Sequence, residues 1–310
     1  MKEPKWLKSH MNSLAGAHGS AHMPHALMIH EAPGGGGEWL AGWVTRLLLC
    51  SNVDGEPCGE CVSCKRVFAG QHPDVARVSF TEESRQLKIE QVRELAAELA
   101  LTSHQGGYKI GIISPADALN RFAANALLKT LEEPPPRTLL ILVAVEPSRL
   151  PATILSRCQR IRIRAPGRVE SVRWLQATRG EGEWNAVLDV LGDAPFIAAD
   201  SDPAAIPRLG SEMRSALEDL SRGAGDPVAT AERWSRADLG LRLRCFENWL
   251  TDRVRGLAQA HLSHGAAPAK LRGLFELMDG VRELVAALDT PLNKSLALEG
   301  LLRRLAPSRG

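Results

Sequence analysis

Apolar residues along this chain group into two kinds of segment. Short runs bounded by glycine, proline or charged residues predict β-strands, and the continuous run from Thr138 to Val145 predicts a strand buried on both faces, as in a parallel sheet. Longer segments with apolar residues at helical spacing predict amphipathic helices. The expected strands are His25–His30, Asp74–Val78, Tyr108–Ile113, Thr138–Val145 and Arg160–Arg164, and the expected helices are Trp6–Ala15, Trp39–Cys50, Lys88–Leu101, Asn125–Glu133 and a short one from Pro151. Residues 1–165 are therefore expected to form an α/β domain with a parallel sheet.

The chain changes character after Ala165-Pro166-Gly167, where we expect a domain boundary. Residues 166–207 are expected to form a small helical domain, with helices Val169–Thr178 and Trp184–Leu191. Residues 208–310 are rich in Leu and Ala, and glycine and proline separate their helical patterns. The expected helices are Glu212–Ser221, Leu239–His261, Lys270–Leu288 and Lys294–Leu305. This last part is predicted to be a helical bundle, with Leu298, Leu301, Leu302 and Leu305 in its core.

Four cysteines within about residues 50–72 are spaced in the sequence as metal ligands often are. Two overlapping CxxC steps place three thiolates on a tight knuckle, and a fourth cysteine upstream can complete a tetrahedron; the set is Cys50, Cys58, Cys61 and Cys64. Zinc prefers such closed sulfur sites, and four protein ligands leave no open position for catalysis. We predict a structural Zn²⁺, against the alternative of four reduced thiols. His72 is a conceivable substitute ligand but is expected to be structural, and Cys158 and Cys245 are expected to be buried.

Composition narrows the class of protein. A length of 310 residues suits two or three domains, and a formal net charge of +2 gives little reason to expect tight, autonomous binding to DNA. The apolar runs are shorter than the roughly 18 to 20 residues of a membrane helix. Residues 1–20 contain lysines but no apolar stretch typical of a secretory signal. We expect a cytoplasmic protein, a compartment in which disulfides are disfavoured.

Two further clusters invite a binding interpretation. A histidine-rich N-terminal tract could bind metal, but its irregular spacing favours polar surface positions; it comprises His10, His18, His22, His25 and His30. A basic stripe alternates with Ile161 and Ile163 on and just after one predicted strand; it comprises Arg160, Arg162, Arg164 and Arg168. They are expected to be a solvated face or an interdomain salt bridge, the alternative being contact with DNA or a neighbouring subunit.

The segment from Asn125 to Pro135 reads NALLKTLEEPP, and a Ser-Arg-Cys loop at Ser156 follows the next strand. This order closely resembles the clamp-loader branch of the AAA+ ATPases. The resemblance implies an AAA+ domain with an inserted zinc module, a small helical lid domain and a C-terminal helical collar by which subunits assemble in a ring. It also implies that Arg157 is an arginine finger for the neighbouring subunit's nucleotide, with Ser156 and Cys158 positioning the loop. A permanently charged planar guanidinium suits the charge of a transferring phosphoryl group.

The chain has the layout of a phosphate-binding P-loop without its chemistry. A strand, a glycine-rich loop and a helix follow in order, with glycines at Gly34, Gly35, Gly36 and Gly37. Aligned on the family's glycines, Gly37 occupies the position of the phosphate-binding Lys, and Glu38 that of the magnesium-binding Ser or Thr. We expect this degenerate loop to bind no nucleotide.

Other parts of the family's ATPase site also differ. Where the family has an acidic pair, this chain reads Pro115-Ala116 with a single Asp117, which the family keeps outside catalysis. The polar sensor expected near Ala144 and Val145 is missing, and Pro195 stands where a sensor Arg is expected. The chain is therefore predicted to have no ATPase activity of its own.

By resemblance, the chain is a ring member of the clamp loader of a bacterial DNA polymerase, docked against an active gamma or tau ATPase subunit. Arg157 would couple that neighbour's ATP use to loading of the sliding clamp on primed DNA, with the delta subunit as a further partner. One alternative is a gamma- or tau-like ATPase that binds and hydrolyses ATP itself. The other is a zinc-knuckle module that binds nucleic acid alone, for which the cysteine spacing is the only feature.

Overall fold

The computed structural model describes residues 2–81, 84, 86–104, 106–264, 268–288, 290 and 292–305, without the side chains of 260–264 and 268–270. The chain divides into two compact units, Met1–Gly167 and Arg168–Gly310. This division lies close to the boundary expected from the sequence. The further separation of residues 166–207 from residues 208–310 stays a prediction.

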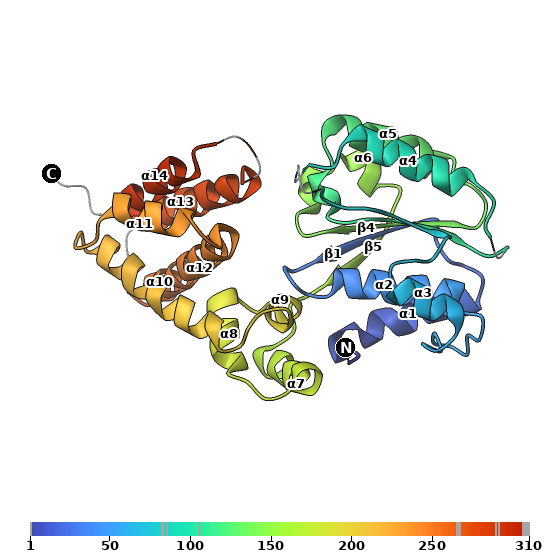
Figure 1. Cartoon of the computed structure of the whole chain (residues 1–310), viewed down its shortest axis with the longest axis horizontal. Coiled ribbons are helices and arrows are strands. Elements are labelled where there is room, and N and C mark those ends of the chain that lie inside the picture. The colour runs from blue at the N-terminus through green and yellow to red at the C-terminus, as the bar shows by residue number, and fades with distance from the viewer. Residues whose placement is uncertain are drawn as a thin grey trace. The chain divides into compact units, whose positions relative to one another are not determined.

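A five-stranded parallel sheet forms the centre of the first unit (Figure 1). The strand order is β2-β3-β4-β1-β5, which places β1 between β4 and the edge strand β5. The strands are β1 (Ala26–Glu31), β2 (Val75–Val78), β3 (Lys109–Ile113), β4 (Thr138–Ala144) and β5 (Gln159–Ile163). Every residue of β4 is buried, as its continuous apolar run predicts. The expected α/β fold with a parallel sheet is confirmed.

Helices cover both faces of this sheet (Figure 1). One face carries α1 (Lys8–Gly19), α2 (Gly37–Leu49) and α3 (Val62–Phe68); the other carries α4 (Ile89–Ala100), α5 (Arg121–Glu132) and α6 (Ala152–Leu155). Alternate residues of β4 contribute to the two cores, with Ile141 in the first and Leu142 in the second. Short 3₁₀ turns connect these elements at η1 (Lys5–Leu7), η2 (Ala116–Ala118) and η3 (Pro147–Arg149).

Two details of the first unit differ from the sequence expectation. Helix α1 continues to Gly19, beyond the predicted end at Ala15, and its buried Met11 and Leu14 pack into the same core as α2. Helix α3 was not predicted as a helix. It is one of the shortest helices in the unit, and Cys61 begins it by accepting a hydrogen bond from the backbone amide of Cys64.

Helices alone form the described part of the second unit. They are α7 (Arg168–Arg179), α8 (Trp184–Leu191), α9 (Pro195–Ala199), α10 (Ala205–Ser221), α11 (Pro227–Ser235), α12 (Leu239–His264), α13 (Pro268–Ala286) and α14 (Lys294–Leu305). Helices α9 and α11 were not predicted from the sequence, and α10 begins seven residues before its expected start. Leu298, Leu301 and Leu302 are buried, as expected for core residues, whereas Leu305, in the last turn of α14, is only half-buried.

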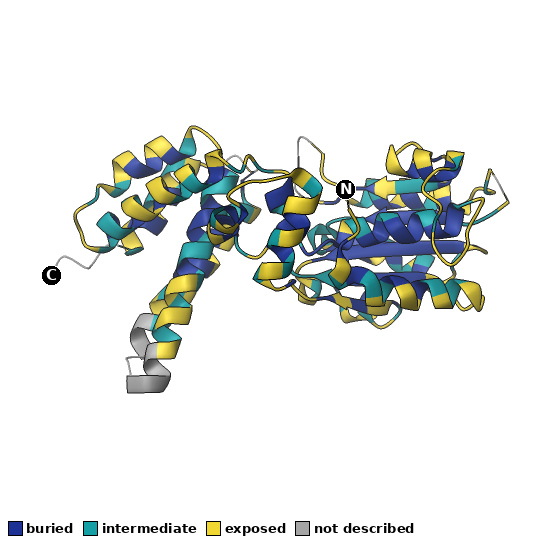
Figure 2. Cartoon of the chain, turned by 90° about the horizontal axis from the view of Figure 1, so that it is seen from below, coloured by how far each residue is buried: buried dark blue, intermediate teal, exposed yellow. Residues whose placement is uncertain are grey.

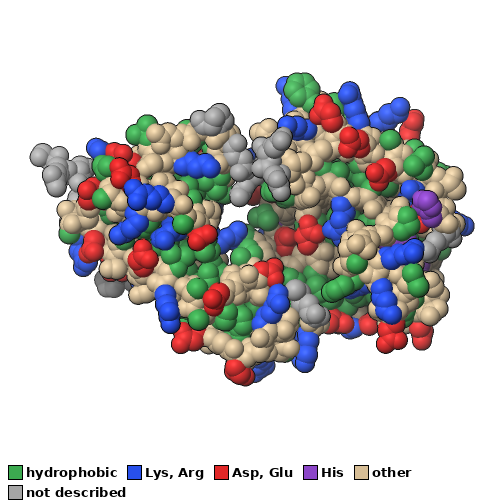
Figure 3. Space-filling model, viewed as in Figure 1, with side chains coloured by type: hydrophobic (Ala, Val, Ile, Leu, Met, Phe, Trp, Pro, Cys, Tyr) green, Lys and Arg blue, Asp and Glu red, His purple; other side chains and the backbone are tan. Residues whose placement is uncertain are grey.

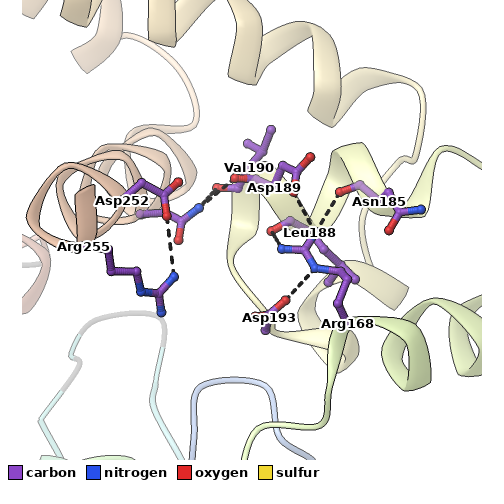
Figure 4. A network of polar contacts seen from close by, with 9 residues as sticks. Arg168, Asn185, Leu188, Asp189, Val190, Asp193, Asp252 and Arg255 are labelled. Atoms are coloured by element: carbon purple, nitrogen blue, oxygen red, sulfur yellow. Dashed lines mark hydrogen bonds and ion pairs between the residues drawn. The ribbon is translucent and has the colours of Figure 1, made fainter. Parts of the chain in front are cut away.

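Polar contacts fix the end of α8 within this second unit (Figure 4). Arg168 pairs with Asp189 and Asp193, at 2.8 Å in each case. From α12, the Asn248 side-chain amide donates to the backbone carbonyl oxygen of Asp189 at 2.8 Å and to that of Val190 at 3.4 Å. These carbonyls lie at the C-terminal end of α8, where no further turn of helix can donate hydrogen bonds to them.

The distribution of charged side chains on the surface agrees with the nearly neutral net charge of the chain. Buried residues lie in the strands and on the inner sides of the helices (Figure 2), while acidic and basic side chains are interspersed on the face of each unit that Figure 3 shows. Among the helices of the described residues, none combines the length and apolar character needed to cross a membrane.

Candidate functional site

The four predicted metal ligands come together at one place. Cys50 follows α2, Cys58 lies in the connecting loop, and Cys61 and Cys64 belong to the first turn of α3. Their sulfur atoms all lie within 4.8 Å of one another, with 3.5 Å between Cys50 and Cys58 and 4.0 Å between Cys50 and Cys61. A zinc–sulfur bond of about 2.3 Å gives a tetrahedral sulfur–sulfur edge of about 3.8 Å. The donor set and its spacing therefore fit a tetrahedral metal ion.

The backbone around this cluster already favours thiolates at two of its positions. Amide hydrogen bonds, chiefly from Cys64, lower the pKa of the Cys61 thiol to about 6, and those from Cys61 and Glu60 lower the pKa of Cys58. Burial raises the pKa of Cys64 to about 12, so a nearby cation would be needed to ionise it at neutral pH. His72 is buried beside the module, with Nε2 3.3 Å from the Ser63 hydroxyl and Nδ1 accepting from the Asp74 amide.

The glycine-rich loop between β1 and α2 has the backbone of an anion-binding turn. Gly34 and Gly36 adopt positive φ angles of 67° and 102°, and α2 begins at Gly37. A Cβ atom on Gly37 would lie 2.8 Å from Val143 Cγ1 and 2.9 Å from Glu31 Cδ. Glycine is therefore required at this position by close packing, whatever the loop binds.

Two side chains of the same unit close onto this loop. The Oε2 atom of Glu31, the last residue of β1, accepts hydrogen bonds from the amides of Gly36 at 2.8 Å and Gly37 at 2.7 Å. Burial raises the pKa of the Glu31 carboxyl, the two amides oppose that rise, and the charge of Glu38 adds to it. From η1, the Trp6 indole donates to the Gly35 carbonyl at 2.8 Å. The Glu38 carboxylate pairs instead with Arg77 at 3.3 Å.

Asp117, which sequence reasoning placed outside catalysis, has a structural contact. Its Oδ2 accepts from the backbone amides of Val145 at 3.1 Å and Glu146 at 2.6 Å, just after β4 ends. The residue therefore joins η2 to the start of η3 across the end of the sheet.

The Ser-Arg-Cys loop lies between α6 and β5. Arg157 has a partly exposed side chain whose Nη2 pairs with Glu132 Oε1 of α5 at 2.8 Å, while Nη1 donates to the Thr153 carbonyl at 2.9 Å. Ser156 also donates to that carbonyl, at 3.1 Å. Cys158 is buried in the core beneath α5 and α6, and burial raises its pKa to about 11.

Strand direction places Arg157 and the glycine loop at opposite ends of the parallel strands. The loop follows β1 and so lies at the carboxyl ends of the strands, whereas Arg157 precedes the parallel strand β5 and lies at their amino ends. The register pairs Leu27 with Gln159 and Glu31 with Ile163, so four residue steps, about 13 Å of backbone, separate the two ends. Arg157 therefore cannot reach a phosphate held by its own loop.

The remaining binding candidates do not join these sites. Among the described residues, the four cysteines are the group found to be able to hold a metal ion, and the N-terminal histidines are not part of it. Arg160 and Arg162 are exposed on the edge strand β5, and Arg164 is exposed just after its end. Arg160 also donates to the Leu155 carbonyl.

Sequence reasoning missed the contacts of Glu31, Trp6 and Glu132. Each joins residues far apart in the chain or across a loop, and none belongs to a motif with a fixed spacing. A carboxylate at the end of a strand that leads into a glycine-rich loop is the one signal that could have drawn attention to Glu31.

Comparison with known proteins agrees with this architecture. A family model described as "DNA polymerase III, delta subunit" matches residues 6–167. The chain is 30% identical to DNA polymerase III subunit delta' of Pseudomonas aeruginosa over 94% of both chains, and 38% identical to that of Yersinia pestis over 81% of this chain and 76% of the other. A tau subunit of Escherichia coli is 30% identical over 53% of this chain but only 25% of its own. The delta' similarity thus extends further along the chain than the tau similarity does.

Proposed function

Because the chain belongs to the DNA polymerase III delta' family and is therefore a clamp-loader subunit, we propose that it is a ring member without ATPase activity that lends Arg157 to a neighbouring gamma or tau subunit. The neighbour's ATP use would then drive loading of the sliding clamp on primed DNA, with the delta subunit as a further partner. The proposed place of this work is the cytoplasm, where a bacterial chromosome is replicated.

The placement of Arg157 carries this proposal. Its guanidinium is partly exposed and belongs to the loop before β5, at the opposite end of the parallel strands from the chain's own glycine loop. An arginine in that position is available to a nucleotide on another subunit. The absence of a lysine and of a magnesium-binding hydroxyl from the loop, which has Gly37 and Glu38 instead, supports the view that the chain holds no nucleotide itself.

A reconstituted clamp loader tests this role. Arg157→Ala should lower the ATP turnover of the neighbouring site by at least about tenfold, since arginine fingers contribute on the order of 10³ to 10⁵ in rate. Arg157→Lys should also be defective because lysine lacks the planar fork. Arg149→Ala, at an exposed arginine of η3, is the matched control and should leave turnover unchanged. Full ATPase with Arg157→Ala would contradict the proposal.

We also propose that the four-cysteine cluster holds a structural Zn²⁺. Supporting this assignment are the four sulfur ligands within 4.8 Å and the fit of their separations to a tetrahedral site. When bound, the ion would neutralise the thiolates and join the end of α2 to the start of α3.

A further inference from the structure

The loop from Gly34 to Gly37 is a fully formed anion cradle. Two of its glycines have positive φ angles, and the amides of Gly36 and Gly37 point to one oxygen atom at the start of α2, a helix of 13 residues. The helix dipole and converging amides of such a turn favour a negative charge. The loop therefore has the backbone that receives a phosphate, with Gly37 and no lysine to neutralise the charge of that phosphate.

The position that a phosphate oxygen would take is already filled from within the chain. Glu31 Oε2 lies 2.8 Å from the Gly36 amide and 2.7 Å from the Gly37 amide, distances typical of charge-assisted hydrogen bonds. The rest of the carboxyl group is packed against the loop, since a Cβ on Gly37 would come within 2.9 Å of Glu31 Cδ. Trp6 also holds the loop, because its indole N–H donates to the Gly35 carbonyl.

We propose that the Glu31 carboxylate is a built-in ligand of this cradle, which keeps the loop in its anion-bound conformation and excludes phosphate groups from solution. This role for Glu31 rests on the proposed function, in which the chain holds no nucleotide, and gives a structural reason for that property. The chain would thus be closed to nucleotides by an internal competitor as well as by the missing lysine. A carboxylate attached to the adjacent strand needs no binding from solution, so it competes at a high effective concentration.

The test compares the full-length chain with Glu31→Ala, using inorganic pyrophosphate as the probe. Amide NMR signals of Gly36 and Gly37 should move upfield in Glu31→Ala because both amides lose their acceptor. Pyrophosphate should then reverse this change with saturation, and should bind this variant at least about tenfold more tightly than the unmodified chain. Sodium chloride at matched ionic strength distinguishes specific binding from charge screening.

Glu38→Ala is the matched control, because that carboxylate lies beside the loop but pairs with Arg77. It should shift the Gly36 and Gly37 signals much less than Glu31→Ala does and should gain much less affinity for pyrophosphate, because both amides keep their acceptor. Glu31→Gln keeps the shape of the side chain and covers the case that Glu31→Ala fails to fold; the amide signals should again shift because a neutral oxygen is a weaker acceptor.

The possible outcomes distinguish the role of Glu31 from the proposed function of the chain. Unchanged glycine amides in both Glu31 variants, or no pyrophosphate binding by a folded Glu31→Ala chain, would overturn the role of Glu31 and leave the proposed function intact. Tight binding of magnesium and ATP by the unmodified chain would overturn the nucleotide-free function itself.

Discussion

At the scale of single residues, Arg157 is held by contacts from its own chain. Glu132 accepts from one end of the guanidinium at 2.8 Å, and the Thr153 carbonyl accepts from the other at 2.9 Å. Both charged side chains are substantially exposed, at 36% and 51%, so the ion pair should contribute less than about 1 kcal/mol to folding. The ion pair would instead serve to hold the Arg157 side chain in one conformation, since a free arginine side chain has about 2 kcal/mol of rotamer entropy.

Glu132→Gln is therefore expected to lower the ATPase of the neighbouring subunit in a reconstituted clamp loader, by a factor between about 3 and 10. This prediction rests on the proposed role of Arg157, and the loss should be smaller than that of Arg157→Ala. Unfolding of the isolated chain by denaturant should be nearly unchanged.

The adjacent carboxylate supplies the control for Glu132. Glu133 is exposed just past the end of α5, and Glu133→Gln should leave both ATPase and stability as they are. A higher ATPase with Glu132→Gln would show that the ion pair stores Arg157 away from its target rather than orienting it.

At the scale of elements, the segment from Cys50 to Phe68 is expected to depend on the proposed zinc ion for its structure. Helix α3 spans only Val62–Phe68, and short helices are marginal unless other contacts stabilise them. We expect the purified chain to contain about one zinc per molecule, and its removal by a chelator to abolish amide protection in α3 while the sheet stays protected. Metal analysis and hydrogen exchange by mass spectrometry measure both.

Two cysteine variants refine this test. Cys58→Ser replaces an exposed member of the cluster and should lose most of the zinc. Cys245→Ala removes a buried thiol of the second unit, so it should keep the metal even though its core packing is weakened. Full zinc content in Cys58→Ser would exclude Cys58 as a ligand.

The spacing of apolar residues correctly predicted those strands and helices in which the apolar residues are the buried ones. The strand Thr138–Ala144 is a continuous apolar run, and α4 has its buried Val92, Leu95 and Leu99 at helical spacing. Helices α9 and α11 were missed because each is short and begins with a proline, at Pro195 and Pro227, that reads as a break. Proline at the first helical position is in fact favourable, since its missing N–H has no partner there anyway.

The sequence predicted the candidate sites themselves but not the residues that contact them. Local spacing was enough to predict the cysteine cluster, and literal motif similarity directed attention to Arg157. The partners of these sites could not be predicted, because they come from tertiary contacts: Trp6 reaches a loop 29 residues away, and Glu132 meets Arg157 across β4 and two short helices.

At the scale of the whole molecule, the division into two compact units means that a contact within one unit should affect that unit alone. Asn248 offers such a contact, because its side-chain amide joins α12 to the carbonyls of Asp189 and Val190 near the end of α8. Asn248→Ala would leave both carbonyls without this donor. We expect a loss of about 1 to 2 kcal/mol in the stability of residues 168–310, with hydrogen exchange in the sheet of the first unit unchanged.

Asp252→Ala provides the comparison within the same helix. Asp252 pairs only at the surface with Arg255, at 3.5 Å with both side chains more than half exposed, so its loss should stay below about 0.5 kcal/mol. Hydrogen exchange, measured separately over residues 2–167 and 168–305, reports the change in stability of each unit in both variants. Equal losses in the two variants would show that the amide of Asn248 adds nothing beyond a surface contact, and weakened protection in the sheet would show that the two units unfold together.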